Sequence, residues 1–221
     1  MDLVQSIAPT FEPLTVPDAE YHLKIDADSD ISSDIVTQES AYLESLIAAA
    51  RTKCEQETSR QLCTATWVLK LPFFPRAGCT NRELYGVPQA RFMGPDDWRS
   101  IYLPKPPAAS VTSVTYYDSA GDSQTFSSTK YTLILGDPVA RIALNYAEVW
   151  PTTRQRQDAV TITYVSGKTQ ATVPAGIKHA MRLMIGNWYE NREAVNIGNT
   201  TSALPFGVDA LLQPYRVMEY V

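Results

Sequence analysis

Histidine and cysteine are scarce in this chain, which has two of the first and three of the second among its 221 residues. His22 and His179 lie far apart in the sequence, and no H-E-x-x-H pair, G-x-S-x-G elbow or phosphate-binding glycine loop accompanies them. The odd set of cysteines contains no C-x-x-C pair, so neither a disulfide framework nor a cysteine-rich zinc site is indicated. The sequence therefore predicts a protein that is not an enzyme and that holds no metal or other cofactor.

Long apolar runs and an excess of basic residues are also missing. No run approaches the roughly 20 residues that cross a bilayer, and the first residues lack the basic and then apolar order of a signal peptide. We therefore expect a protein that is made in the cytoplasm and does not contact a membrane. The formal net charge of -5 opposes strong general affinity for nucleic acid, because phosphate binding depends on clustered lysine and arginine. Any contact with DNA is expected to be local or transient.

The hydrophobic fraction of 44% is enough for a proper core, and helical periodicity marks both ends of the chain. Thr15 and Asp18 have the spacing of a capping box, which predicts a short helix to about Ile25. A second apolar stripe predicts a long helix over about 33–60. Near the carboxyl end Pro174 fits a first helical turn. The core-facing stripe of that last helix is formed by Ile177, Met181, Met184 and Trp188.

The middle of the chain alternates between apolar and polar residues, as β-strands do. This pattern predicts strands that begin at Thr64 and cover Val111–Tyr117 and Val160–Val165, with shorter ones at 131–135 and 141–145. The short turns between them favour antiparallel pairing. The predicted fold is therefore α+β, in which long N-terminal and C-terminal helices pack together as a helical base and carry an inserted antiparallel β region. We expect one compact domain with a helical part at 1–62, the β region at 63–172 and a C-terminal helix and tail at 173–221.

A long glycine- and proline-containing segment at about 75–99 interrupts the β region. Loops of this length in a compact domain are usually functional or mobile, and arginine and aromatic residues are favoured at interfaces. We expect the segment to form a surface loop that contacts another protein. The residues proposed for this contact are Arg76, Arg82, Tyr85, Arg91, Phe92 and Trp98.

An aspartate-rich segment at 26–34 imitates the first ligand positions of a calcium-binding EF-hand loop. An EF-hand needs glycine at the sixth position for its turn and glutamate at the twelfth for bidentate binding. Ile31 and Thr37 stand at these two positions. A solvated loop that precedes a helix is therefore the better interpretation.

Recognisable motifs are spread along most of the chain. They are Leu46–Arg51, Glu57–Leu62, Thr66–Pro75, Ile101–Pro104, Ser110–Asp118, Trp150–Pro151, Val160–Gly167, Val173–Glu193 and Leu204–Arg216. In this order the motifs resemble those of tailed-bacteriophage head-to-tail connector, or adaptor, proteins. Two features depart from the family pattern. Ser59 stands where the family has glycine after the long helix, and the segment at 76–99 is longer than the usual link.

The resemblance implies a structural role in the neck of a virion. Members of the family form a ring, typically of twelve copies, beneath the portal of the DNA-filled head, where they continue the DNA channel. The implied partners are other copies of the chain, the portal protein and the tail or next neck protein, while double-stranded DNA passes without specific binding. The alternative is a tail-completion or stopper-type neck protein, which would bind the tail side and not the portal.

The C-terminal segment after Ser202 is expected to end in a short amphipathic helix. We expect it to dock onto the portal, and the alternative is that it folds back onto its own subunit. The proposed docking residues are Val208, Leu211, Leu212, Tyr215 and Arg216.

Overall fold

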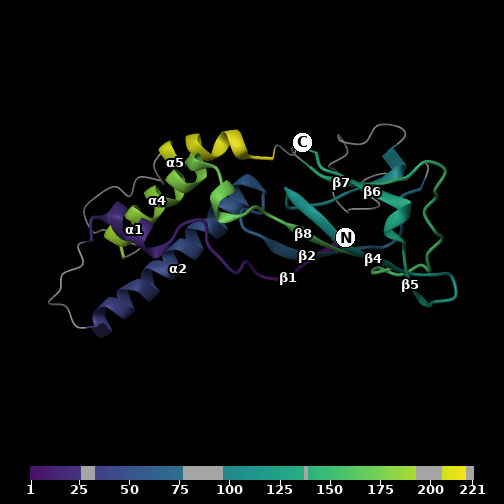
Figure 1. Ribbon diagram of the computed structural model, residues 1–221, viewed down its shortest axis with the longest axis horizontal. Coiled ribbons are helices and arrows are strands. Elements are labelled where there is room, and N and C mark those ends of the chain that lie inside the picture. Colours follow the sequence, from purple (N-terminus) through teal and green to yellow (C-terminus); the bar gives the residue numbers. More distant parts are fainter. Residues whose placement is uncertain (26–32, 77–96, 137–138, 193–205, 218–221) are drawn as a thin grey trace. The chain divides into compact units, whose positions relative to one another are not determined.

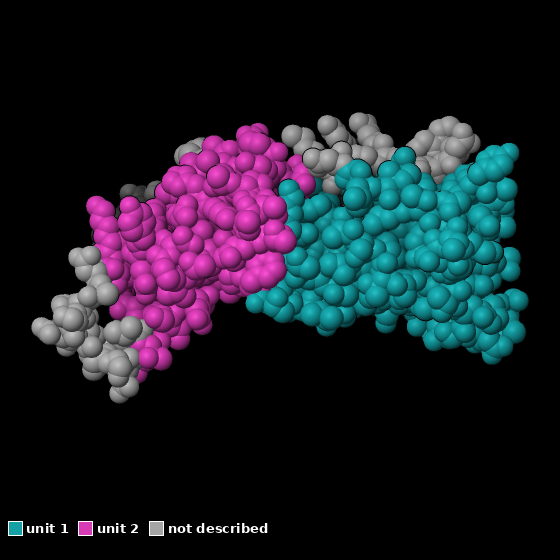
Figure 2. All heavy atoms as spheres, in the orientation of Figure 1, with its two compact units in different colours: residues 1–10, 64–168, 217–221 teal, residues 11–63, 169–216 magenta. Residues whose placement is uncertain are grey.

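The computed structural model describes residues 1–25, 33–76, 97–136, 139–192 and 206–217, which form two compact units (Figures 1 and 2). Residues 11–63 and 169–216 make up a helical unit, and residues 1–10, 64–168 and 217–221 make up a sheet unit. The predicted α+β class with antiparallel sheets is confirmed. Among the described residues, no helix is long and apolar enough to cross a membrane.

In its described residues the helical unit contains four α-helices: α1 (Val16–Leu23), α2 (Ser33–Thr58), α4 (Ala175–Glu190) and α5 (Phe206–Leu212). Short 3-10 helices, η4 (Gln170–Thr172) and η5 (Gln213–Tyr215), precede α4 and follow α5. Helix α4 packs against each of the other three (Figure 1). The shared core receives Ile177, Met181 and Met184, at most 1% exposed, and the partly buried Trp188.

Helix α1 begins as the capping-box spacing predicts. The Thr15 hydroxyl accepts a hydrogen bond from the Asp18 N–H at 3.3 Å, and the Asp18 carboxylate accepts one from the Thr15 N–H at 3.1 Å. These bonds satisfy two donors that a helix start would otherwise leave unpaired. The bond from the Thr15 backbone is the main reason why the pKa of Asp18 is lowered.

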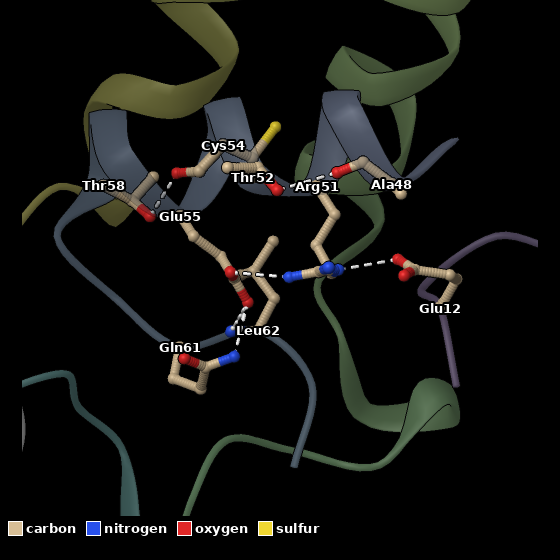
Figure 3. Close-up of polar contacts among 9 residues, drawn as sticks. All are labelled: Glu12, Ala48, Arg51, Thr52, Cys54, Glu55, Thr58, Gln61 and Leu62. Atoms are coloured by element: carbon tan, nitrogen blue, oxygen red, sulfur yellow. Dashed lines mark hydrogen bonds and ion pairs between the residues drawn. The ribbon is translucent and has the colours of Figure 1, made fainter. Parts of the chain in front are cut away.

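A network of charged and polar groups closes the end of α2 (Figure 3). The Arg51 guanidinium lies 2.7 Å from a Glu12 oxygen and 2.9 Å from a Glu55 oxygen. The other Glu55 oxygen accepts hydrogen bonds from the Gln61 side chain at 2.7 Å and the Leu62 N–H at 2.9 Å. Glu55 thereby ties the chain that leaves α2 back onto the helix. Burial raises the pKa of its carboxyl above the ordinary 4.5, although the bonds from Leu62 and Arg51 oppose that shift.

The described part of the sheet unit contains two antiparallel sheets (Figure 1). The five-stranded sheet has the order β1-β2-β8-β4-β5. Its strands are β1 (Asp2–Ile7), β2 (Ala65–Leu71), β8 (Val160–Ser166), β4 (Ala108–Tyr117) and β5 (Ser123–Thr125). The three-stranded sheet has the order β3-β7-β6, with β3 (Ser100–Tyr102), β7 (Arg141–Leu144) and β6 (Tyr131–Ile134), and the 3-10 helices η2 (Asp97–Arg99) and η3 (Ser128–Lys130) precede β3 and β6.

One hydrophobic core joins the two sheets. The central strand β8 buries every second side chain, Val160, Ile162 and Tyr164, completely, as its alternating sequence predicts. Ile142 of β7 brings the smaller sheet onto the same core. The Tyr164 hydroxyl donates to the Pro104 carbonyl at 2.7 Å, so the only polar atom of this buried ring is paired.

The strands at 64–71, 111–117, 131–135, 141–145 and 160–165 are all confirmed to within three residues. The expected turn after Tyr117 is also present: the Asp118 carboxylate accepts bonds from three backbone N–H groups, and Gly121 has a φ of +101°. Strands β1, β3 and β5 were not predicted. Each carries fewer than four apolar residues, too few for a clear alternation.

Replacing Glu55 tests whether this network stabilises the helical unit. We expect Glu55→Gln to lower the free energy of unfolding by about 1–3 kcal/mol at pH 7, because Arg51 loses a buried partner and an amide nitrogen faces existing donors. Glu57→Gln is the matched control. Glu57 lies on the same helix and forms a solvent-accessible ion pair with Lys53, so its substitution should lower the free energy of unfolding by about 1 kcal/mol or less. Urea unfolding of the two variants provides the measurement. Equal losses would contradict the role given to Glu55.

The same pair of variants has a pH signature. Because the pKa of Glu55 is raised in the folded state, the protonated carboxyl contributes stability below pH 4.5, and this contribution is lost as the pH rises through the folded-state pKa. Part of it is therefore already lost at neutral pH. The pKa of Glu57 is lowered, chiefly by its hydrogen bond from Lys53, so its contribution is lost in the opposite direction, on acidification. The deficit of Glu55→Gln relative to the native chain should therefore shrink between pH 4.5 and 7, whereas that of Glu57→Gln should grow.

Candidate functional site

The predicted docking segment lies against its own helical unit. Val208 and Leu212 are 3% and 0% exposed and belong to the core formed with α2 and α4. Leu211 and Tyr215 are partly buried against the same core. The Tyr215 ring fits over the start of α4 because residue 176 is glycine: a Cβ there would meet the ring at 3.0–3.1 Å. The apolar face of α5 is thus used within its own chain, as in the alternative that the sequence left open.

Polar contacts fix the end of this segment. The Arg216 guanidinium lies 2.7 Å from a Glu57 oxygen on α2 and 3.5 Å from an Asp209 oxygen on α5. The Arg60 side chain donates to the Tyr215 carbonyl at 2.6 Å. Arg216 itself is 38% exposed, so its charge remains accessible to a partner. Of the five predicted docking residues, Arg216 is the most exposed.

The predicted interface loop is described only at its two ends. Arg82, Tyr85, Arg91 and Phe92 lie outside the described residues. Arg76 is exposed, and its guanidinium stacks over Phe73 at 5.3 Å. Trp98 is half-buried, and its carbonyl accepts a hydrogen bond from the Trp150 indole at 3.1 Å.

Trp150 ties both ends of the loop to the sheet unit. Its ring stacks on Phe74 at 4.8 Å and contacts Phe126 at 5.3 Å, so it belongs to the aromatic part of the core. Arg76 and Trp150 also line a surface hollow of about 450 Å³ together with prolines and threonines. The described residues near the two ends of the segment are thus both linked to Trp150: Arg76 lines the same hollow, and the Trp98 carbonyl accepts the hydrogen bond from the indole.

The two histidines come together in space. His22 of α1 and His179 of α4 line an open hollow of about 640 Å³, which also receives Tyr21, Lys24 and Arg182. The Asp18 carboxylate at this hollow is already engaged by Thr15 and lies 3.8 Å from Arg182. The lining is polar and partly basic, and it includes no cysteine or serine nucleophile.

Two of the three cysteines are described, and both are buried free thiols. Burial raises the pKa of Cys54 and Cys63 to about 12. Such thiols stay protonated at neutral pH and are poor nucleophiles. Cys54 is fully buried in the core of the helical unit, where it acts as a small hydrophobic side chain. Within the described ranges, no group of three or more histidine, cysteine, aspartate or glutamate side chains could hold a metal ion.

Comparison with known proteins shows the fold at full length. No protein-family model matches the chain, and no curated protein matches it. Among solved structures, a chain in the neck of an empty gene transfer agent particle, computed with C6 symmetry, is 22% identical, with a TM-score of 0.72. A chain in the virion of the native gene transfer agent particle has the same identity and TM-score. A chain in the native neck, computed with C12 symmetry, is 21% identical with a TM-score of 0.66.

Each of these matches covers 100% of this chain and 98% of the other. At such low identity the likeness establishes the fold. That fold, found in the necks of phage-like particles, is consistent with the resemblance to head-to-tail connector proteins that the sequence motifs indicate.

Shortening Leu212 tests the packing of the C-terminal segment. We expect Leu212→Ala to cost about 2–5 kcal/mol of unfolding free energy, because it opens a cavity in the core shared by α2, α4 and α5. Its exposed neighbour provides the control, and Gln213→Ala should change stability by about 0.5 kcal/mol or less. Denaturant unfolding followed by circular dichroism measures both. A Leu212→Ala variant as stable as the control would mean that α5 is not held on its own unit.

Proposed function

We propose that this chain is a structural protein of the neck of a tailed-phage-like virion. Copies form a ring, of twelve subunits in the leading hypothesis, that joins the portal of the DNA-filled head to the tail and continues the DNA channel. The role is mechanical and not enzymatic.

One observation carries most of the proposal: the likeness to neck chains extends over both units and leaves out almost nothing of either chain. A match limited to the sheets would be weak support, because antiparallel sheets with short turns serve many functions. Here the match includes the residues of both the helical unit and the sheet unit, because it covers 100% of this chain. The C6 and C12 symmetries of those necks favour a ring as the functional assembly.

The charge of the chain suits a channel through which DNA moves. A subunit with a net charge of -5 does not offer the clustered cations that would hold DNA phosphates. We expect no complex with a 50-base-pair duplex in a gel-shift assay at physiological salt. A stable complex under these conditions would favour a DNA-binding module and contradict passage without binding.

We further propose that the C-terminal end contacts the portal through the side that stays accessible. Val208 and Leu212 hold the segment on its own unit, and Arg216, with the half-buried Leu211 and Tyr215, offers a charged and partly apolar contact. The exposed end of the 75–99 loop at Arg76 is proposed for contacts with a neighbouring subunit or the tail.

The assembly itself is tested by electron microscopy and mass measurement of the purified protein, alone and after mixing with its portal. We expect a ring, formed either alone or only on the portal. A monomer that ignores the portal but binds the purified tail would instead support the alternative, a tail-completion or stopper-type neck protein.

The contribution of Arg216 to portal binding is tested by substitution. Arg216→Gln should weaken portal binding about fivefold to tenfold, the typical loss for an interfacial arginine, while it changes unfolding free energy by about 1 kcal/mol or less. Lys53→Gln is the matched control, because it also removes one cation from Glu57 but leaves Arg216 in place. Calorimetric titration with the portal compares the two. Equal affinities would place the portal contact elsewhere on the surface.

A further inference from the structure

Strand β1 is an edge strand of the five-stranded sheet as far as the described part of the chain shows. Within the described residues it pairs on one side only, with β2. Five of its six residues are exposed, including Val4 at 46% and Ile7 at 57%. From Leu3 to Ile7 it has no charge and no proline, the features by which proteins usually block an edge strand. An edge of this kind is suited to pairing with a further strand.

The opposite edge of the same sheet is only half covered. Strand β5 pairs with Thr115–Tyr117 of β4, and the Phe126 N–H adds a bond to the Val114 carbonyl. Residues Ala108–Ser113, the first half of β4, have no strand on that side in the part of the chain that the structure describes. This half also lacks charge and proline, and Ala109, Ser110 and Thr112 are exposed.

The two open edges lie at the same height in the sheet. The paired residues form rows across it, and one row joins Val4 to Val68, Thr163 and Ser113. Gln5 and Ile7 are likewise level with Val111 and Ser110. The row through Asp2 meets Thr115, where β5 begins to cover the edge. The part of β1 beyond Asp2 therefore matches the open half of β4 in position and length.

Strand direction also matches. Three antiparallel steps separate β1 from β4, so the two strands run in opposite directions. Neighbours in a ring of many copies differ by a small rotation, which nearly preserves strand direction. A neighbour's β1 placed beside β4 is consequently antiparallel to it, as two strands in such a sheet pair. Two register shifts interrupt this half of β4, and β-bulges are frequent at sheet edges and barrel rims.

We propose that β1 of one copy pairs antiparallel with Ala108–Ser113 of the next copy, so that the five-stranded sheets join into a continuous band around the ring. The inference rests on the proposed ring function and specifies its subunit contact. Such a contact is heterologous: each copy offers one edge to one neighbour and the other edge to the next, which is what a closed ring needs. Pairing of β1 with β1 would instead close a dimer and leave the β4 edge of each copy open.

Disulfide cross-linking tests this contact directly. In a Cys79→Ser background the other two native thiols are buried. Val4→Cys is combined with Ser113→Cys, because directly opposed residues on antiparallel strands are close enough for a disulfide. After ring assembly on the portal and mild oxidation, we expect a ladder of covalent oligomers on a denaturing gel. Val4→Cys combined with Ser110→Cys covers a register shifted toward the start of β4.

Two controls separate the outcomes. Val4→Cys with Thr115→Cys should give no ladder, because β5 covers Thr115. Val4→Cys alone should stay monomeric, and a covalent dimer from it would overturn the proposal in favour of β1–β1 pairing. Rings that form on the portal without a ladder from either cysteine pair would overturn this contact and leave the neck function standing. Absence of any ring would overturn both.

Discussion

The antiparallel pairing of β2 with β8 is the constraint on which the rest of the structure depends. Ala65 at the start of β2 lies opposite Ser166 at the end of β8, and the Thr64 hydroxyl donates to the Lys168 carbonyl. The sheet residues between them therefore form an insertion whose two ends are adjacent. Because of this closure, segments more than a hundred residues apart in sequence, α2 and α4, can share one core. Within the helical unit, Glu55 fixes the chain between α2 and β2 by accepting hydrogen bonds from Gln61 and Leu62.

The parts of the fold that could be predicted are the elements whose own residues show a clear hydrophobic periodicity or a capping motif. Strand β8 alternates apolar and polar residues from Val160 to Tyr164, and α1 has its capping box, so type and position follow from local sequence. The departure at Ser59 also has a structural meaning. This residue has a φ of +54°, in the left-handed region that favours glycine at a helix end, which explains why glycine would suit that position. The motif comparison therefore identified a real backbone requirement.

What local sequence could not supply is the identity of a partner. The spacing of Val208 and Leu212 predicts an apolar helix face, but the same face suits a portal and the α2–α4 core equally well. The structure shows the core, because the chain returns to the helical unit and Gly176 leaves room for Tyr215. Strand β1 was missed for a related reason. Its only inward side chain is Leu3, and its position depends on a ladder to β2, some sixty residues later in the chain.

Helix α5 and strand β1 are held on the subunit in different ways, and this difference bears on assembly. Helix α5 is fixed by two buried side chains and by ion pairs, whereas β1 is fixed by one row of backbone bonds and the partly buried Leu3. Segments with few buried contacts open at low free-energy cost. A second ladder of hydrogen bonds, to β4 of a neighbouring copy, would pair the backbone N–H and C=O groups of β1 that point away from β2. The same ladder would cover Val4. Assembly would then order a strand that has few buried contacts in the single subunit, so that formation of the ring and full stability of the sheet become coupled.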